Sequence, residues 1–182
     1  MSDGASYKEQ LLESARRNNT ELFQQIAAGV GPDHAPLARL INGALEVVSG
    51  NSAVHIATAN GNWDVLDMML DVEGVEIDPR NRDGDTPLHL AVRLAAADAP
   101  FGYFLADNLI DAGSDVTIRD RHGQRPVDLV VGDARLRALL ESAEYAGRAA
   151  PALETGGRGE NSAENEDLSD RSDGSGLASD LE

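Results

Sequence analysis

The chain has 182 residues, 41% of them hydrophobic, which suits one domain with tails better than two domains. Aromatic residues make up only 4% and the formal charge is −17, so direct nucleic-acid binding is not expected. The absence of cysteine excludes disulfides and thiolate chemistry and fits a reducing compartment. We find no signal-peptide pattern and no apolar run of the roughly 20 residues that span a bilayer, so we expect no membrane contact. The expected location is the cytoplasm, the nucleus or both.

Two short amphipathic helices open the folded part of the chain. Between residues 7 and 17, Leu11 and Ala15 recur at helical spacing, and after a polar break Leu22 and Ile26 continue the pattern. Together these segments predict a helix pair.

The next segment predicts a loop followed by an additional helix. Residues 29–36 are rich in glycine and proline, which favours a loop. Residues 37–48 then carry apolar side chains at helical spacing, namely Leu37, Leu40, Ile41, Leu45 and Val48. We therefore expect an inserted helix over residues 37–48.

The most specific motif is NRDGDTPLHLAV at residues 81–92. Gly84 indicates a tight turn, Thr86 a helix N-cap and Pro87 the first helical residue. The six residues from Thr86 to Ala91 resemble the T-P-L-H-x-A signature of the ankyrin repeat, a helix pair preceded by a projecting turn called a finger. The resemblance implies an all-α solenoid of stacked repeats.

Similar units flank this central repeat. Residues 50–57, GNSAVHIA, soften the motif, with Ser52 as the cap and Ala53 in place of the proline. After the central motif, an insertion at residues 94–100 precedes the second helix. The turn glycines lie 34 and 39 residues apart, at Gly50, Gly84 and Gly123, against a family period of about 33.

The two ends depart from the pattern, as the terminal units of a solenoid do. Residues 14–23 resemble the middle of a repeat without its turn. The last unit keeps Gly123 and Pro126, but Arg125 replaces the threonine and Asp128 replaces the histidine. We expect its second helix to be short.

These patterns define the domain organisation. We predict a disordered N-terminus at 1–6, an ankyrin-repeat domain of about four repeats at 7–148, and a disordered acidic tail at 149–182. Within the domain we expect an N-terminal cap at 7–48 with the inserted helix, repeats at 49–80 and 81–119, and a C-terminal cap at 120–148. Residues 154–182 contain nine acidic residues and two arginines, with almost nothing apolar to bury.

No arrangement of residues indicates catalysis or a cofactor, so the protein is not expected to be an enzyme. Asp83 and Asp85 could in principle do acid–base work, but they sit in a predicted solvated turn. His55 and His89 occupy equivalent places and could suggest a metal site, although no third ligand follows at suitable spacing. In the family this histidine bonds across the turns and ties neighbouring repeats together. We therefore expect no metal and a structural role for both.

The resemblance implies protein recognition through the finger turns and the concave helix face. The residues that flank the turns or adjoin that face are our candidate partner contacts: Arg80, Arg82, Asp83, Asp85, Arg93, Arg119, Arg121, His122 and Gln124. Arginine forks suit carboxylate or phosphate groups on a partner. The alternative is that these arginines pair with Asp83, Asp85 and Asp120 of the same turns and still remain exposed.

The aromatic residues near the insertion also have two interpretations. Trp63, Phe101 and Tyr103 either pack in the core or form a ridge for a partner, and packing is favoured.

The sequence therefore predicts a non-enzymatic protein–protein interaction module, monomeric on its own. One alternative is an acidic chaperone or inhibitor that shields a basic client, such as a ribosomal or nucleic-acid-binding protein, because long-range charge speeds capture. Another is an adaptor whose arginine-edged fingers hold an acidic segment of a larger assembly.

Overall fold

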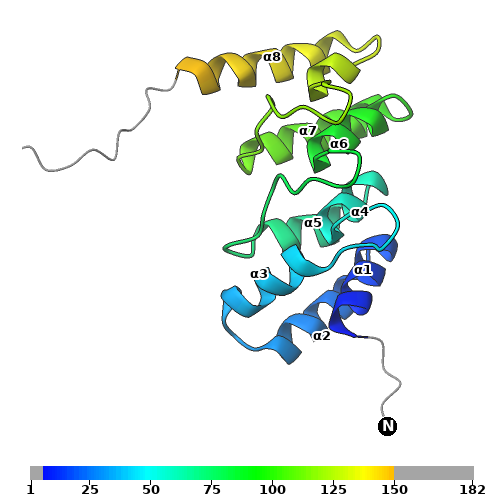
Figure 1. Ribbon diagram of the computed structural model, residues 1–182, viewed down its shortest axis with the longest axis vertical. Coiled ribbons are helices and arrows are strands. Elements are labelled where there is room, and N and C mark those ends of the chain that lie inside the picture. The colour runs from blue at the N-terminus through cyan, green and yellow to red at the C-terminus, as the bar shows by residue number, and fades with distance from the viewer. Residues whose placement is uncertain (1–5, 150–182) are drawn as a thin grey trace, which may run out of the picture. The chain divides into compact units, whose positions relative to one another are not determined.

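The computed structural model describes residues 6–149, and there the chain forms a stack of helices without a named strand (Figure 1). The helices are α1 (Tyr7–Arg17), α2 (Thr20–Val30), α3 (His34–Gly43), α4 (Ala53–Ala59), α5 (Trp63–Leu70), α6 (Pro87–Ala95), α7 (Ala99–Asp111), the 3-10 helix η1 (Pro126–Leu129) and α8 (Ala134–Ala149). The all-α prediction is confirmed. Within residues 6–149, none of these helices has the length and apolar character needed to cross a bilayer.

The helices stack in two rows. The first helix of each pair packs on the next along the series α1, α4, α6 and η1, while α2 packs on α5 and α7 packs on α8. The added helix α3 lies against α1, α2 and α4. One aliphatic core runs through every layer and contains, among others, Leu11, Leu66, Leu88, Leu105 and Leu136. A repeat thus buries its apolar faces against its neighbours, as a solenoid requires.

Local signals fix where most helices begin. The Ser6 hydroxyl accepts from the Glu9 N–H, the Asn19 side chain from the Leu22 N–H, and the Asp98 side chain from the Phe101 N–H. Such contacts satisfy N–H groups that have no partner within the helix. The helix predicted between residues 7 and 17 is confirmed at those bounds.

The predicted loop at 29–36 and helix at 37–48 are wrong in their bounds. Helix α2 continues to Val30, and α3 begins at His34 and ends at Gly43. The backbone then forms a hairpin, in which the Glu46 N–H donates to the Asn51 carbonyl (2.8 Å) and the Gly50 N–H to the Glu46 carbonyl (2.9 Å). Local backbone bonds thus override the apolar periodicity.

The expected short second helix of the last unit is also wrong. The first helix of that unit is the short one, a single 3-10 turn, whereas α8 has 16 residues. Helix α8 is long because Leu136 and Leu140 bury against the preceding layer, and the Asp133 carboxylate accepts from the Leu136 N–H at its start. It runs one residue past the predicted domain end at 148. The N-terminal residues 1–5 and the tail 150–182 lie outside the described residues.

Candidate partner-binding surface

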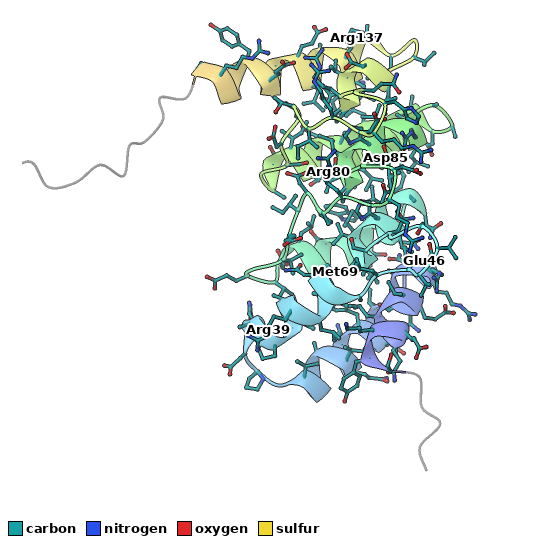
Figure 2. The ribbon with its side chains drawn as sticks, in the orientation of Figure 1. Arg39, Glu46, Met69, Arg80, Asp85 and Arg137 are labelled. Atoms are coloured by element: carbon teal, nitrogen blue, oxygen red, sulfur yellow. The ribbon has the colours of Figure 1, made fainter. Side chains whose placement is uncertain are left out.

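Three turns lie side by side along one edge of the stack. We call residues 45–50, 80–85 and 119–124 the first, second and third fingers, and together the finger edge. The Arg82 N–H donates to the Ser49 carbonyl (3.0 Å), and the Arg121 N–H donates to the Asp83 carbonyl (2.8 Å). Figure 2 shows Glu46 of the first finger below Arg80 of the second. The fingers therefore form one hydrogen-bonded edge rather than three independent loops.

The second and third fingers each fold around one side-chain oxygen. Asn81 Oδ1 accepts from the N–H groups of Asp83 and Asp85, both at 2.9 Å. In the third finger, Asp120 Oδ1 accepts from the N–H groups of His122 (2.8 Å) and Gln124 (3.0 Å). Burial disfavours the charge of Asp120, but these two bonds together with the nearby His89 and His122 hold the pKa of the carboxyl below its usual value.

A glycine is required where the second and third fingers meet. Gly84 has φ +75°, and a Cβ there would lie 2.9 Å from the backbone nitrogen of Arg121. The turn predicted at this position is confirmed, and its glycine permits both the left-handed backbone and the close approach of the next finger.

Arg93 joins the two fingers from helix α6. Its guanidinium binds both carboxylate oxygens of Asp85 and lies 3.6 Å from Asp120 Oδ2. Both carboxylates are buried, whereas the Arg93 side chain remains 43% exposed. The hydrogen bond to Asp85 raises the pKa of Arg93 despite partial burial. Asp85 therefore pairs with an arginine of its own repeat, as the alternative interpretation of the sequence expects of the turn aspartates.

The other finger arginines differ in their partners. Arg121 pairs with Asp83 at 2.7 Å, whereas Arg80 donates to the carbonyls of Gly84 and Arg119. Arg119 donates to the Gly123 carbonyl at 2.7 Å. Within residues 6–149, the Arg82 guanidinium has no hydrogen-bond or carboxylate partner. Pairing within the turns therefore neutralises only part of this arginine set.

The two remaining candidates of the third finger are exposed. His122 Nε2 accepts from Arg121 Nε at 3.2 Å. The Gln124 carbonyl accepts from the Asp120 N–H, and the residue is exposed. Partner binding by any of the nine candidates stays a prediction.

The two buried histidines act as links between repeats. The Ser52 N–H donates to His55 Nδ1 (3.2 Å), which places the ring proton on Nε2, and that nitrogen donates to the Asp85 carbonyl (2.9 Å). His89 repeats this arrangement between the Thr86 N–H and the Gln124 carbonyl. Burial lowers the pKa of His55 and so favours the neutral ring. The structural role predicted for both histidines is confirmed.

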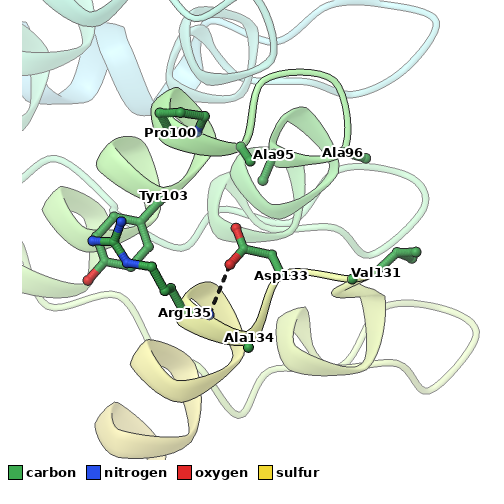
Figure 3. A pocket seen from close by; sticks show the side chains of 10 residues that line it. Ala95, Ala96, Pro100, Tyr103, Val131, Asp133, Ala134 and Arg135 are labelled. Atoms are coloured by element: carbon green, nitrogen blue, oxygen red, sulfur yellow. Dashed lines mark hydrogen bonds between the residues drawn. The ribbon is translucent and has the colours of Figure 1, made fainter.

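The aromatic residues near the insertion pack on one another. The rings of Trp63 and Phe104 meet edge to face with their centres 4.8 Å apart, and Phe101 stacks on Phe104 with ring centres 5.9 Å apart. The Arg135 guanidinium lies 5.0 Å from the centre of the Tyr103 ring. Figure 3 shows Arg135 over that ring at the rim of a hollow, where Asp133 accepts from the Arg135 N–H. Packing, the favoured interpretation, accounts for these contacts.

The first finger contains surface residues that apolar spacing predicts to lie on a helix. Leu45, Val47 and Val48 are 52%, 82% and 81% exposed. The run Ser49-Gly50 directly after them is a turn signal that could have revealed the hairpin.

Stacked helix pairs, hydrogen-bonded fingers and histidine links between layers define a helical-repeat solenoid. A family model for ankyrin repeats (3 copies) matches residues 11–120. An ankyrin repeat-containing protein of Saccharomyces cerevisiae is 43% identical over 172 residues, which cover 92% of each chain. The chain belongs to the ankyrin-repeat family.

Two further relatives are more distant. The inhibitor of Bruton tyrosine kinase of Xenopus laevis is 33% identical over 85 residues, 46% of this chain and 6% of that protein. A putative ankyrin repeat protein of fowlpox virus is 32% identical over 127 residues, 65% of this chain and 35% of its own length. Most of the length of each of these relatives lies outside the match.

Proposed function

We propose that the protein is a non-enzymatic interaction module whose protein partner contacts the finger edge and the concave face of the first helices. The observation that carries the proposal is the finger edge itself. Backbone bonds join its three turns, yet side chains such as Arg82 and Val47 extend from it without serving the fold. A surface ordered before binding loses little conformational freedom when a partner docks.

The use of the buried polar groups supports binding rather than catalysis. His55, Asp85 and Asp120 are the kind of groups that catalysis uses, but each has a structural partner: His55 bonds to the next finger, Asp85 to Arg93, and Asp120 to the backbone of its own turn. The frog relative is named for inhibiting a kinase, a function that acts through another protein.

We further propose that the protein is a monomer on its own and works in the cytoplasm or nucleus.

Site-specific cross-linking tests this function. The chain has no cysteine, so a photoreactive maleimide reports on a single introduced thiol. We expect His122→Cys on the third finger to cross-link a protein from an extract of the native cells. The matched control, Gln24→Cys, places the probe on an exposed position of α2, and it should not capture that protein. Capture from position 24 alone, or from neither position, would contradict the proposal.

A second candidate function rests on the charge of −17. In this alternative, the acidic surface and tail shield a basic client, and attraction over long range makes binding weaken with salt. The test uses full-length protein in which the nine carboxylates of residues 154–182 are replaced by amides. If a client with pI above about 9 is lost on this change, shielding accounts for the binding. If it is retained, recognition lies in the repeats.

A further inference from the structure

The first finger carries an apolar cluster that the fold leaves uncovered. Seven large hydrophobic side chains of residues 6–149 are exposed, and three of them, Leu45, Val47 and Val48, fall within four residues of one another. The hairpin that holds them is set by backbone bonds, not by their burial. Clustered exposed apolar side chains on an ordered turn are typical of an interaction site.

A groove joins this cluster to the second finger. One wall contains Leu45, Glu46, Val47 and Gly50, and the other contains Arg80, Asn81 and Arg82. The two walls are held together by the bond from the Arg82 N–H to the Ser49 carbonyl and by that from the Asn81 amide to the Asn51 side chain (2.8 Å). An apolar surface and a cationic one therefore meet at a fixed separation.

The cationic character continues along the edge. The second and third fingers together with Arg93 contain five arginines and three aspartates. Two of these aspartates, Asp85 and Asp120, are buried beside Arg93. Glu46, the acid of the first finger, is already paired with Arg16 (2.8 Å), and Asp83 is paired with Arg121. Unpaired positive charge therefore gathers here on a strongly acidic protein. This arrangement repels a basic segment and attracts carboxylates.

We propose that the finger edge binds an extended peptide segment with apolar side chains at one end and aspartate or glutamate at the other. The apolar end covers Leu45, Val47 and Val48, and the carboxylates meet Arg82 and then Arg80 and Arg119. This inference rests on the proposed function and adds the chemistry and direction of the partner segment. It distinguishes the finger edge from the rest of the acidic surface.

The test selects ligands without assuming their sequence. Full-length protein is used as bait for a displayed library of random peptides, and the selected peptides are titrated by fluorescence anisotropy. We expect enrichment of peptides that combine a leucine-like cluster with aspartate or glutamate. Arg82→Glu, and Val47→Ser with Val48→Ser, should each weaken binding at least about tenfold, since they reverse one charge contact or remove the apolar one.

Matched controls separate this result from general effects. Arg39→Glu changes an exposed arginine of α3, and Val131→Ser changes a valine that is 83% exposed elsewhere, and both should leave the affinity unchanged. Arg82 has no side-chain partner within residues 6–149 and Val47 lies outside the core, so the variants should fold, as circular dichroism can verify.

Three outcomes would overturn the inference: enrichment of lysine- or arginine-rich peptides, no enrichment over empty beads, or equal affinity for Arg82→Glu. Tighter binding after the carboxylates of residues 154–182 are replaced by amides would instead make the chain's own tail the occupant, which also overturns it. The cross-link from position 122 does not depend on this chemistry, because position 122 supplies none of the contacts inferred here. The proposed function can therefore stand where the inference fails.

Discussion

Each buried histidine uses one ring nitrogen within its own repeat and the other toward the next finger. Asp128 occupies the equivalent place in the last unit, where its carboxylate accepts from the Arg125 N–H at 2.8 Å. Asp128 therefore reproduces the bond within the repeat but not the bond to the next finger. Among the described residues no finger follows this unit, so a histidine here would find no carbonyl for its Nε2 proton.

The first prediction concerns the pH dependence of stability. Burial lowers the pKa of His55 in the folded protein, whereas the unfolded chain titrates near 6.5. As pH falls, the unfolded state takes up the proton first, so stability declines from about pH 6.5 down to the lower folded pKa. His55→Gln should remove this part of the slope in urea midpoints measured between about pH 7.5 and 5.5.

Exposed His34 provides the control for this prediction. His34→Gln should keep the wild-type slope, because it changes a histidine outside the core. The slope is compared rather than the absolute stability, since losing the bond to the Asp85 carbonyl destabilises the protein at any pH. An unchanged slope in His55→Gln would show that another group controls the acid response.

The second prediction concerns Arg93, which faces two buried carboxylates. Removing a buried charge's partner costs far more than breaking an exposed pair, so Arg93→Met should lower the free energy of unfolding by about 3 kcal/mol. Arg17→Met is the matched control, because it breaks an exposed pair with Glu13 and should cost less than about 1 kcal/mol. Chemical denaturation measures both. Equal losses would mean that solvent already screens the Arg93 site.

Most helix starts are predictable from the sequence because they depend on near neighbours. Thr86 with Pro87 opens α6, as local capping rules indicate. The predicted inserted helix starts too late because glycine and proline in residues 29–36 favour a loop over its first turn. It ends too late because periodicity groups Leu45 and Val48 with the residues before them, whereas the backbone bonds of the hairpin link residues across a turn.

The candidate surface is predictable in outline from the spacing of the turns. This spacing places Arg80, Arg82 and Arg119 along one edge, whatever contacts their side chains make. Which oxygen each guanidinium reaches depends on the packing of neighbouring fingers. Arg80 thus binds a carbonyl of the third finger rather than a carboxylate of its own turn.

The third prediction concerns the close packing of α6 and α7. A Cβ on Gly102 would lie 2.4 Å from the backbone of Ala95, so Gly102→Ala must push the helices apart. We expect a loss of about 2 kcal/mol in thermal or urea unfolding. Gly147→Ala is the control, since nothing lies within 4 Å in helix α8, and it should raise stability by up to about 1 kcal/mol. A neutral Gly102→Ala would show that the two helices separate easily.

Stability is shared unequally along the stack. Helix α4 packs between α1 and α6, and α6 packs between α4 and η1. The last layer of the described residues has a neighbour on one side only, and its first helix is a single 3-10 turn. In a solenoid, contacts with adjacent repeats supply much of the stability, so this layer should open first.

Hydrogen exchange measured by mass spectrometry tests this order. Amides of α4 and α6 should exchange at least about tenfold more slowly than those of α8, because opening α8 exposes only one interface. Leu136→Ala removes a buried side chain that anchors α8 and should cost that layer about 3 kcal/mol. Exchange in α8 should then accelerate while α4 changes little. Equal acceleration in α4 would mean that the repeats unfold as one unit, since the loss at Leu136 would be felt through the whole stack.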